Sequence, residues 1–312
     1  MGVTAETSLS LGEGSTPLVH ARRLSAALGC ELHLKCDGLN PTGSFKDRGM
    51  VVAVERALQA GARYVVCAST GNTAASAAAY AARAGLEAIV LTPAGATAGP
   101  KRAQARAAGA HVIEIRGTFD DALNLCRELG RRDGYVVVNS LNADRVEGQK
   151  SVVPELVEQL GRAPDVIALP FGGGGNVSAV AAACDEVGIT PRLLVGEAAE
   201  RPTTWASAIR IGDPAHAEHV AGLVAAGRVE VFSLTEEELA AAWRDVARVE
   251  GVFCEPASAA GVAALRHCAD STRGLVAVAI LTGHGLKDPD AVADASDEVV
   301  EPTVDAILAV LA

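Results

Sequence analysis

One lysine stands in a setting that suits covalent chemistry. Lys46 follows a stretch of turn formers and hydroxyl residues, NPTGSF at positions 40–45, and opens a segment of helical pattern, Asp47–Ala60. The positive end of a helix dipole and partial desolvation both favour a neutral amine, the form that reacts with an aldehyde to give an imine. The chain has five lysines against 22 arginines, so a lysine here is a rare choice. We therefore predict a covalent role for Lys46 rather than that of a solvated surface lysine.

A second polar stretch follows an apolar run and opens another helix. Ser69, Thr70, Gly71, Asn72 and Thr73 lie between the expected strand 64–68 and the expected helix 72–84. Hydroxyls, an amide side chain and free backbone N–H groups then converge on one point, which suits a carboxylate. The same composition also makes ordinary helix caps, so this stretch is informative only together with the others.

A third stretch consists of glycines. Gly172, Gly173, Gly174 and Gly175 precede Asn176, between the expected strand 166–169 and the expected helix 176–187. Without Cβ atoms, successive amides can wrap a phosphate at a helix N-terminus. The spacing is that of neither a Walker loop nor a dinucleotide fingerprint. We predict a phosphate cradle rather than a plain tight turn.

A fourth polar residue, Thr282, ends the apolar run 275–281. Open α/β sheets place ligands at the carboxyl ends of their strands. A hydroxyl at this position could meet a ring nitrogen.

The elements that must position these residues alternate between β-rich runs and Ala-rich helical segments, which predicts an α/β fold with parallel strands. Expected strands lie at 31–36, 64–68, 88–91, 111–115, 135–138, 166–169, 192–196, 229–234 and 275–281. Expected helices lie at 47–60, 72–84, 119–129, 146–160, 176–187, 235–249 and 257–268. Thr235 and Glu238 fit a capping box, and Gly85 fits a left-handed cap. Nine strands indicate two sheets, and we place the boundary between two lobes near residues 139 to 150.

Composition narrows the class of partner. The net charge is -11 and the basic residues are scattered, which argues against nucleic acid and anionic membranes. No apolar run reaches membrane-spanning length and the N-terminus has no signal-peptide pattern, so we expect a cytoplasmic protein. The seven cysteines and seven histidines lack metal-ligand spacing, and His216 and His219 are expected in a polar loop, so no metal site is predicted.

Taken in order, these stretches resemble the tryptophan synthase β-like (fold type II) pyridoxal-phosphate enzymes, and the residues within each stretch are similar to those of threonine synthases. The resemblance covers nearly the whole chain. Further family-like segments are GEGSTPL at 12–18, FDDAL at 119–123, AIRIG at 208–212 and CEPASA at 254–259. The most specific segment is NSLNADRVEGQK at 139–150, which is similar to the one that holds the substrate's phosphate in threonine synthases.

The resemblance implies two open-sheet α/β lobes, 1–145 and 146–312, with the first ~40 residues able to pack on the second lobe and the cofactor in the cleft between them. It also implies a pyridoxal 5'-phosphate enzyme in which Lys46 is the Schiff-base lysine and acid/base. It assigns the ring contact to Phe45, the phenolic oxygen to Asn72, the cofactor phosphate to Gly172–Asn176 and the pyridine nitrogen to Thr282. The substrate's carboxylate is assigned to Ser69, Thr70 and Asn72, and its phosphate to Thr73, Asn139, Ser140 and Arg145. Arginine gives bidentate, charge-assisted bonds to phosphate.

The implied activity is that of a lyase in threonine biosynthesis, which converts O-phospho-L-homoserine and water to L-threonine and phosphate. By analogy within the family, a homodimer is expected. One departure is that threonine synthases usually show asparagine and alanine where this chain has Gly173 and Gly174, and the glycine-only form is closer to the threonine and serine dehydratases.

Three alternatives therefore stay open. The first is a dehydratase that removes water from threonine or serine and has no use for Arg145. The second is a related enzyme of specialised metabolism that replaces a β or γ phosphate with another nucleophile. The third is a protein that binds pyridoxal phosphate without turnover.

Overall fold

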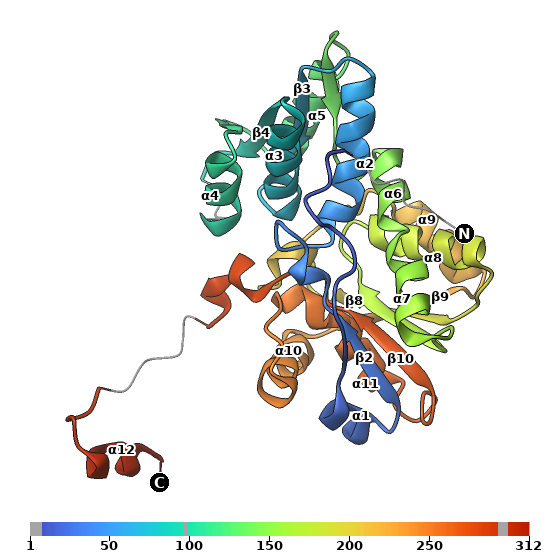
Figure 1. Ribbon diagram of the computed structural model, residues 1–312, viewed down its shortest axis with the longest axis vertical. Helices are drawn as coiled ribbons and strands as arrows, with labels where there is room; N and C mark the ends of the chain where they lie inside the picture. Colours follow the sequence, from blue (N-terminus) through green and yellow to red (C-terminus); the bar gives the residue numbers. More distant parts are fainter. Residues whose placement is uncertain (1–7, 96–98, 293–298, 312) are drawn as a thin grey trace.

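The computed structural model describes residues 8–95, 99–292 and 299–311, and their strands form two sheets (Figure 1). The larger sheet has six strands in the order β1-β2-β10-β7-β8-β9, and the smaller has four in the order β5-β4-β3-β6. Neighbouring strands are parallel throughout, except that β1 runs antiparallel to β2. Parallel strands need crossover connections, and the helices between them supply these. The α/β class predicted from the sequence is confirmed.

The larger sheet is built from both ends of the chain. Its strands are β1 (Leu18–His20), β2 (Glu31–Lys35), β7 (Val166–Pro170), β8 (Arg192–Ala198), β9 (Val229–Leu234) and β10 (Val276–Ile280). The helices that lie next to these strands in the sequence are α1 (Arg22–Leu28), α7 (Val152–Leu160), α8 (Gly175–Val187), α9 (Ala217–Ala225), α10 (Glu236–Glu250) and α11 (Ala260–His267). Early and late segments therefore share one lobe.

The smaller sheet lies in the upper part of Figure 1. Its strands are β3 (Tyr64–Ala68), β4 (Glu87–Pro93), β5 (His111–Ile115) and β6 (Tyr135–Val137). The helices of this part are α2 (Lys46–Gln59), α3 (Asn72–Ala84), α4 (Gly99–Ala107), α5 (Phe119–Leu129) and α6 (Ala143–Gln149). The short 3-10 helices are η1 (Asp37–Leu39), η2 (Ser207–Ile209), η3 (Pro256–Ala259), η4 (Gly285–Lys287) and η5 (Pro289–Val292), and α12 (Val304–Leu311) ends the chain.

The larger sheet is buried on both faces. All five residues of β7 are buried, and they alternate between two cores, with Val166 and Ala168 in one and Ile167 and Leu169 in the other. Successive side chains of a strand point to opposite faces, so a continuous apolar run is what a strand covered by helices on both sides requires. This explains why β7 reads as an unbroken apolar run in the sequence.

Helix ends follow their sequence signals. Thr235 and Glu238 form the expected capping box at the start of α10, and Gly85 ends α3 with φ 70°. The run expected as one helix over 146–160 is instead two helices, α6 and α7, with a break at Lys150 and Ser151. The expectation of a polar loop at His219 is wrong, because His219 lies inside α9.

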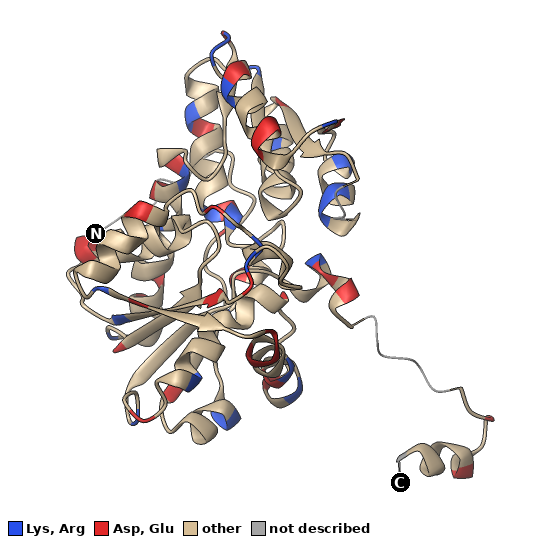
Figure 2. Ribbon diagram, turned by 180° about the vertical axis from the view of Figure 1, so that it is seen from behind, with Lys and Arg blue, Asp and Glu red and all other residues tan. Residues whose placement is uncertain are grey.

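The division into lobes at residue 145 remains a prediction, and that position falls inside α6. Basic and acidic residues are interspersed over both parts of the molecule (Figure 2). None of the described helices combines the length and apolarity needed to cross a bilayer. Within the same residues, no group of three or more His, Cys, Asp or Glu side chains could hold a metal ion.

Candidate active site

The turn before α2 is fixed by the residue that follows Lys46. The Asp47 carboxylate accepts hydrogen bonds from the Thr42 amide (2.7 Å), the Thr42 hydroxyl (2.6 Å) and the Ser76 hydroxyl of α3 (2.6 Å). The Phe45 amide donates to the Thr282 carbonyl at 2.9 Å, and Ser44 forms a β-bridge with Gly283. Lys46 and Thr282, 236 positions apart in sequence, are therefore neighbours at the carboxyl end of β10.

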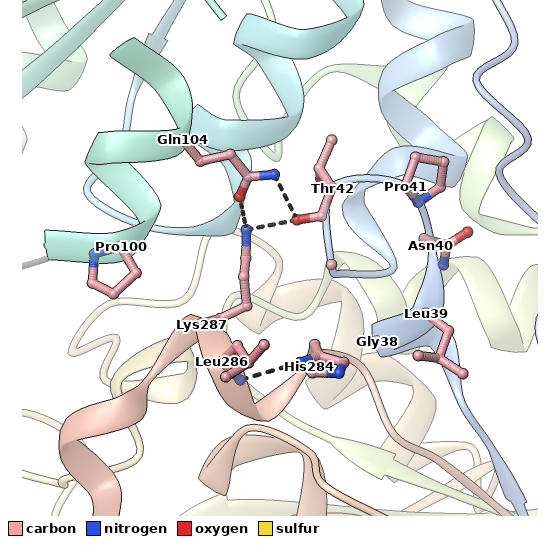
Figure 3. A pocket seen from close by; sticks show the side chains of 11 residues that line it. Gly38, Leu39, Asn40, Pro41, Thr42, Pro100, Gln104, His284, Leu286 and Lys287 are labelled. Atoms are coloured by element: carbon pink, nitrogen blue, oxygen red, sulfur yellow. Dashed lines mark hydrogen bonds between the residues drawn. The ribbon is translucent and has the colours of Figure 1, made fainter. Parts of the chain in front are cut away.

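The outer side of the same turn is held by a second lysine. Lys287 Nζ donates to the Thr42 carbonyl at 2.7 Å and also to Gln104 of α4, whose own amide donates to Thr42 at 3.1 Å (Figure 3). Burial lowers the pKa of Lys287 to about 8. These bonds close one side of a hollow of about 400 Å³ and support the turn from outside.

Lys46 itself is set up as a nucleophile. Burial, and next the positive charge of Arg145, lower the pKa of the Lys46 amine to about 7, against a smaller raising effect of Glu255. Its Nζ lies 4.1 Å from the centre of the Phe45 ring. A large fraction of this amine is consequently neutral at physiological pH, as imine formation requires.

Asn72 is held by Glu255, which is in turn paired with Lys101, and the sequence predicted no role for either of these two residues. Its amide donates to Glu255 Oε2 at 2.8 Å, and the other carboxylate oxygen lies 2.9 Å from Lys101 Nζ. Asn72, Lys101 and Glu255 are all buried, and the Asn72 side-chain oxygen has no partner. The available signal for Glu255 was a carboxylate inside the otherwise apolar run FCEPASAAG at 253–261. Glu255 is thus a buried anion that orients Asn72 within the site.

The start of α3 remains open for an anion. Its N-cap is Gly71, and no side chain caps the first turn. The first amides of a helix have no partner within the helix, so those of α3 can bind an anion. Ser69, Thr70 and Thr73 lie half-buried beside them. The stretch therefore differs from an ordinary self-capped helix start.

The glycine stretch curves around the N-terminus of α8. Gly174 has φ +86°, and a Cβ built on it would lie 2.9 Å from His216 Cβ. Arg201 donates to the Gly172 carbonyl at 3.3 Å and lies over the Phe171 ring. Asn176 Nδ2 and Ser178 Oγ are buried without partners at this end of the helix. These unpaired donors and first-turn amides fit a phosphate group.

Thr282 lies across from the cradle, at the end of β10. It is 7% exposed, and its hydroxyl lies 3.2 Å from that of Ser258. Ser258 Oγ also accepts from the Gly283 amide at 2.9 Å. A neutral hydroxyl pair, rather than a carboxylate, therefore stands at this position.

The segment after β6 contributes a buried cation. Arg145 is 0% exposed, and its Nη1 donates to the Val138 carbonyl at 3.1 Å. Its Nε and Nη2 have no partner. Burial lowers the pKa of Arg145 to about 10. Two of the three guanidinium nitrogens are thus buried without a hydrogen-bond acceptor.

Of the other two residues of this segment, Asn139 binds the backbone of β3 and Ser140 binds a histidine side chain. The Asn139 amide donates to the Ala68 carbonyl (2.9 Å) and accepts from the Ala68 amide (3.0 Å). The Ser140 carbonyl accepts from His216 Nε2 at 2.9 Å. The Asn139 side chain is therefore anchored to β3 through one of its two amide hydrogens, and its role as a phosphate ligand stays a prediction.

Comparison with known proteins identifies the family of this chain. The model of the family described as "Pyridoxal-phosphate dependent enzyme" matches residues 9–283. A threonine synthase of Mycobacterium leprae is 46% identical over 97% of this chain and 90% of its own length, and one of Halalkalibacterium halodurans is 43% identical over 97% and 90%. The chain belongs to the threonine synthase family of pyridoxal-phosphate dependent enzymes. The resemblance stated from the sequence is confirmed, and with it the cofactor and the class of pyridoxal-phosphate dependent lyase.

Solved structures agree on the fold. A cysteine synthase of Entamoeba histolytica superposes with a TM-score of 0.81 at 19% identity, covering 96% of each chain. An O-ureido-L-serine synthase variant gives the same TM-score at 19% identity, covering 98% of each chain. At this identity the likeness concerns the fold, which is the fold type II arrangement expected for a threonine synthase.

Proposed function

We propose that the protein converts O-phospho-L-homoserine and water to L-threonine and inorganic phosphate. The observation that carries the proposal is Arg145, a fully buried guanidinium with Nε and Nη2 unpaired. A buried charge without a counterion is costly, and the phosphate of a substrate would relieve this cost with bidentate bonds. Since Arg145 is fully buried, the side chains above it move aside when the phosphate enters. The family relationship supports the same substrate.

Some of the site residues bind the substrate, and Lys46 transfers protons. The open first turn of α3, with Ser69, Thr70 and Thr73, holds the substrate's α-carboxylate and the near side of its phosphate. Arg145, with the Ser140 hydroxyl, holds the phosphate until it leaves from Cγ. The neutral amine of Lys46 takes a proton from Cα and then one from Cβ, and the electron pair left at Cβ forms a Cβ–Cγ double bond as phosphate leaves from Cγ with the electrons of the broken C–O bond. A proton is then returned to Cγ, water adds its hydroxyl at Cβ and gives up its other proton, and a proton returned to Cα completes threonine.

The cofactor would be held by four parts of the chain. The cradle Gly172–Asn176 would bind its phosphate, Phe45 and Asn72 its ring and phenolic oxygen, Thr282 its ring nitrogen, and Lys46 its aldehyde carbon. Bound pyridoxal phosphate supplies an electron sink for the carbanions of this reaction. Because a hydroxyl at Thr282 does not keep the ring nitrogen protonated, it limits that sink and disfavours transamination.

The first experiment is an assay of purified, cofactor-loaded protein with O-phospho-L-homoserine. Phosphate and threonine released in equal amounts are the expected result. A loaded protein without turnover would contradict the substrate assignment. Release of 2-oxobutanoate from L-threonine that persists in Arg145→Ala would identify a dehydratase instead. A homodimer and a cytoplasmic location, both expected from the sequence, belong to the same proposal, and the dimer is checked by light scattering.

A further inference from the structure

A histidine outside the proposed catalytic set connects the two anion-binding segments. His216 immediately precedes α9, and its backbone amide donates to the Gly173 carbonyl at 3.1 Å. Its side chain reaches the segment after β6, where Nε2 lies 2.9 Å from the Ser140 carbonyl oxygen. A carbonyl oxygen only accepts, so the imidazole is the donor in this bond. One half-buried residue thus binds both the cofactor cradle and the segment proposed to hold the substrate's phosphate.

The glycine at position 174 makes room for the Cβ of His216, whereas the ring itself lies over Gly175, where a Cβ would be 3.5 Å from Nε2, an ordinary contact. A Cβ at Gly174 would lie 2.9 Å from His216 Cβ and 3.2 Å from both Phe171 and Val220. Real Cβ atoms essentially never approach so closely, and the φ of +86° is itself unfavourable for other residues. At Gly173, by contrast, the nearest atom to a Cβ is Ile211 Cδ1 at 3.7 Å, an ordinary contact. Of these two cradle glycines, Gly174 is therefore the one tied to His216.

We propose that His216 is a positioning residue that fixes the substrate-phosphate segment against the cofactor cradle, and that Gly174 is required to admit it. The inference rests on the proposed function, because it takes Ser140 and Arg145 as the place of the substrate's phosphate. Hydrogen bonding turns the Ser140 carbonyl toward His216. The carbonyl oxygen, which is the negative end of this peptide group, therefore stays hydrogen-bonded to the imidazole. It does not point at an arriving phosphate and does not repel it. His216 in this way sets the span between the two phosphate sites.

The test uses the cofactor-loaded enzyme and the variants His216→Ala, His216→Gln, Gly174→Ala and the double variant Gly174→Ala/His216→Ala. The dissociation constant of inorganic phosphate is measured by calorimetry, together with kcat and KM for O-phosphohomoserine and the dissociation constant of pyridoxal phosphate. Loss of one hydrogen bond predicts that His216→Ala weakens phosphate binding and raises KM about tenfold, with kcat changed less than about twofold. Glutamine places an amide N–H near the position of Nε2, so His216→Gln is expected to restore most of the affinity.

The double variant separates the two roles of Gly174. If Gly174→Ala acts by displacing residue 216, it weakens phosphate binding in the parent enzyme. In the His216→Ala background the contact with the Cβ of residue 216 remains, but no imidazole bond is left to lose, so no further loss of phosphate affinity is expected. Backbone strain at position 174 acts in both backgrounds and is read from the dissociation constant of pyridoxal phosphate. Additive losses of phosphate affinity would overturn the link between the two residues.

Comparison with Arg145→Ala distinguishes failure of this inference from failure of the proposed function. Phosphate binding that is weakened by Arg145→Ala but unchanged by His216→Ala would refute the role of His216 and leave the phosphate site in place. Phosphate binding unaffected by either change would remove the phosphate site itself, and both proposals with it. A loss in His216→Ala that glutamine does not restore would indicate general loosening, which also contradicts the inference. If His216→Ala does not fold, His216→Gln and Gly174→Ala carry the same comparison.

Discussion

At the scale of single residues, a buried guanidinium acts on a buried amine. The positive charge of Arg145 contributes to the lowered pKa of Lys46. A phosphate bound to Arg145 cancels part of that charge, so it raises the proton affinity of the Lys46 amine. In the proposed reaction this amine must accept a proton from Cα once the substrate is bound. Arrival of the substrate therefore prepares the base that acts on it.

The pH dependence of cofactor capture tests this interaction. Only the neutral amine attacks an aldehyde, and the Lys46 pKa is about 7, so attachment of pyridoxal phosphate to the apoenzyme should accelerate as the pH rises through about 7. In Arg145→Ala the midpoint should move to higher pH, because a charge that disfavours the ammonium form is gone. The growth of visible absorbance after mixing measures both. Lys46→Ala, which should show no such band, is the control, and a midpoint near pH 10 in the parent would contradict the assignment.

Substrate affinity tests Arg145 directly. We expect Arg145→Ala to weaken binding of the phosphorylated substrate by about 2 to 4 kcal/mol, the cost of one lost charge-assisted contact to phosphate. Steady-state kinetics with O-phosphohomoserine measure the change. Arg116→Ala, at an exposed arginine of the same lobe, should leave KM unaltered. Equal kinetics for the two variants would remove Arg145 from the site.

Sequence reasoning found the residues that have a local signal. Lys46, the glycine cradle and the start of α3 each stand at a strand or turn that feeds a helix, and such junctions are visible in the order of residues. Glu255, Lys101 and His216 act through contacts between segments distant in sequence, such as the 183 positions between Asn72 and Glu255. No spacing rule joins such residues, so only the folded structure brings them together.

At the scale of elements, the position of Lys46 depends on the joint between α2 and α3. The buried Asp47 carboxylate binds Thr42 before α2 and Ser76 within α3. Burial raises its pKa, and the hydrogen bonds from Ser76 and Thr42 oppose that effect. One side chain therefore fixes both the turn that carries the lysine and the helix whose first turn faces the substrate.

Replacement of Asp47 should loosen this joint. Asp47→Asn keeps the shape but turns one accepting oxygen into a donor, which then faces hydroxyl and amide donors. We expect a loss of about 2 to 4 kcal/mol in the free energy of unfolding, measured by urea denaturation. The exposed Asp133→Asn is the matched control and should change it by less than about 0.5 kcal/mol. Similar losses in the two variants would show that the joint contributes nothing specific.

The strands were easier to predict than the helices. β3, β5 and β9 have the bounds expected from their apolar runs, whereas the three-residue β1 is too short to show any alternation. The helices α1, α4 and α9 were not expected. α4 begins with Gly99 and Pro100, which read as a turn, and the break between α6 and α7 falls at residues without a helix-ending signal. Tertiary packing decided these cases over local propensity.

At the scale of the whole molecule, the first strands belong to the sheet formed by the second half of the chain. β2 pairs with β10 in parallel, with Glu31 opposite Val276 and Lys35 opposite Ile280. The chain therefore starts in the larger lobe, crosses to the smaller one at α2 and returns after β6. The turn that carries Lys46 lies at the first of these crossings.

Truncating a side chain of β2 should affect the larger lobe before the smaller. Leu34 is 0% exposed in the core of the larger sheet, so Leu34→Ala should cost about 2 to 5 kcal/mol of stability. Hydrogen exchange should then accelerate first at amides of β10 and β7, and later at those of β3 and β4. Ile113→Ala on β5, where the side chain is 46% exposed, is the control with little expected effect. Uniform acceleration over both sheets would contradict the separate cores.

The pairing of β2 with β10 also fixes an order of events during synthesis. A ribosome releases Glu31 long before Val276, so the early strand waits while about 240 residues are added, at ~5 to 20 residues per second. The smaller sheet, contained within residues 64–137, is complete well before that. In the nascent protein the segment that carries Lys46 therefore meets the smaller sheet first, and the larger sheet is completed only when the final strand emerges.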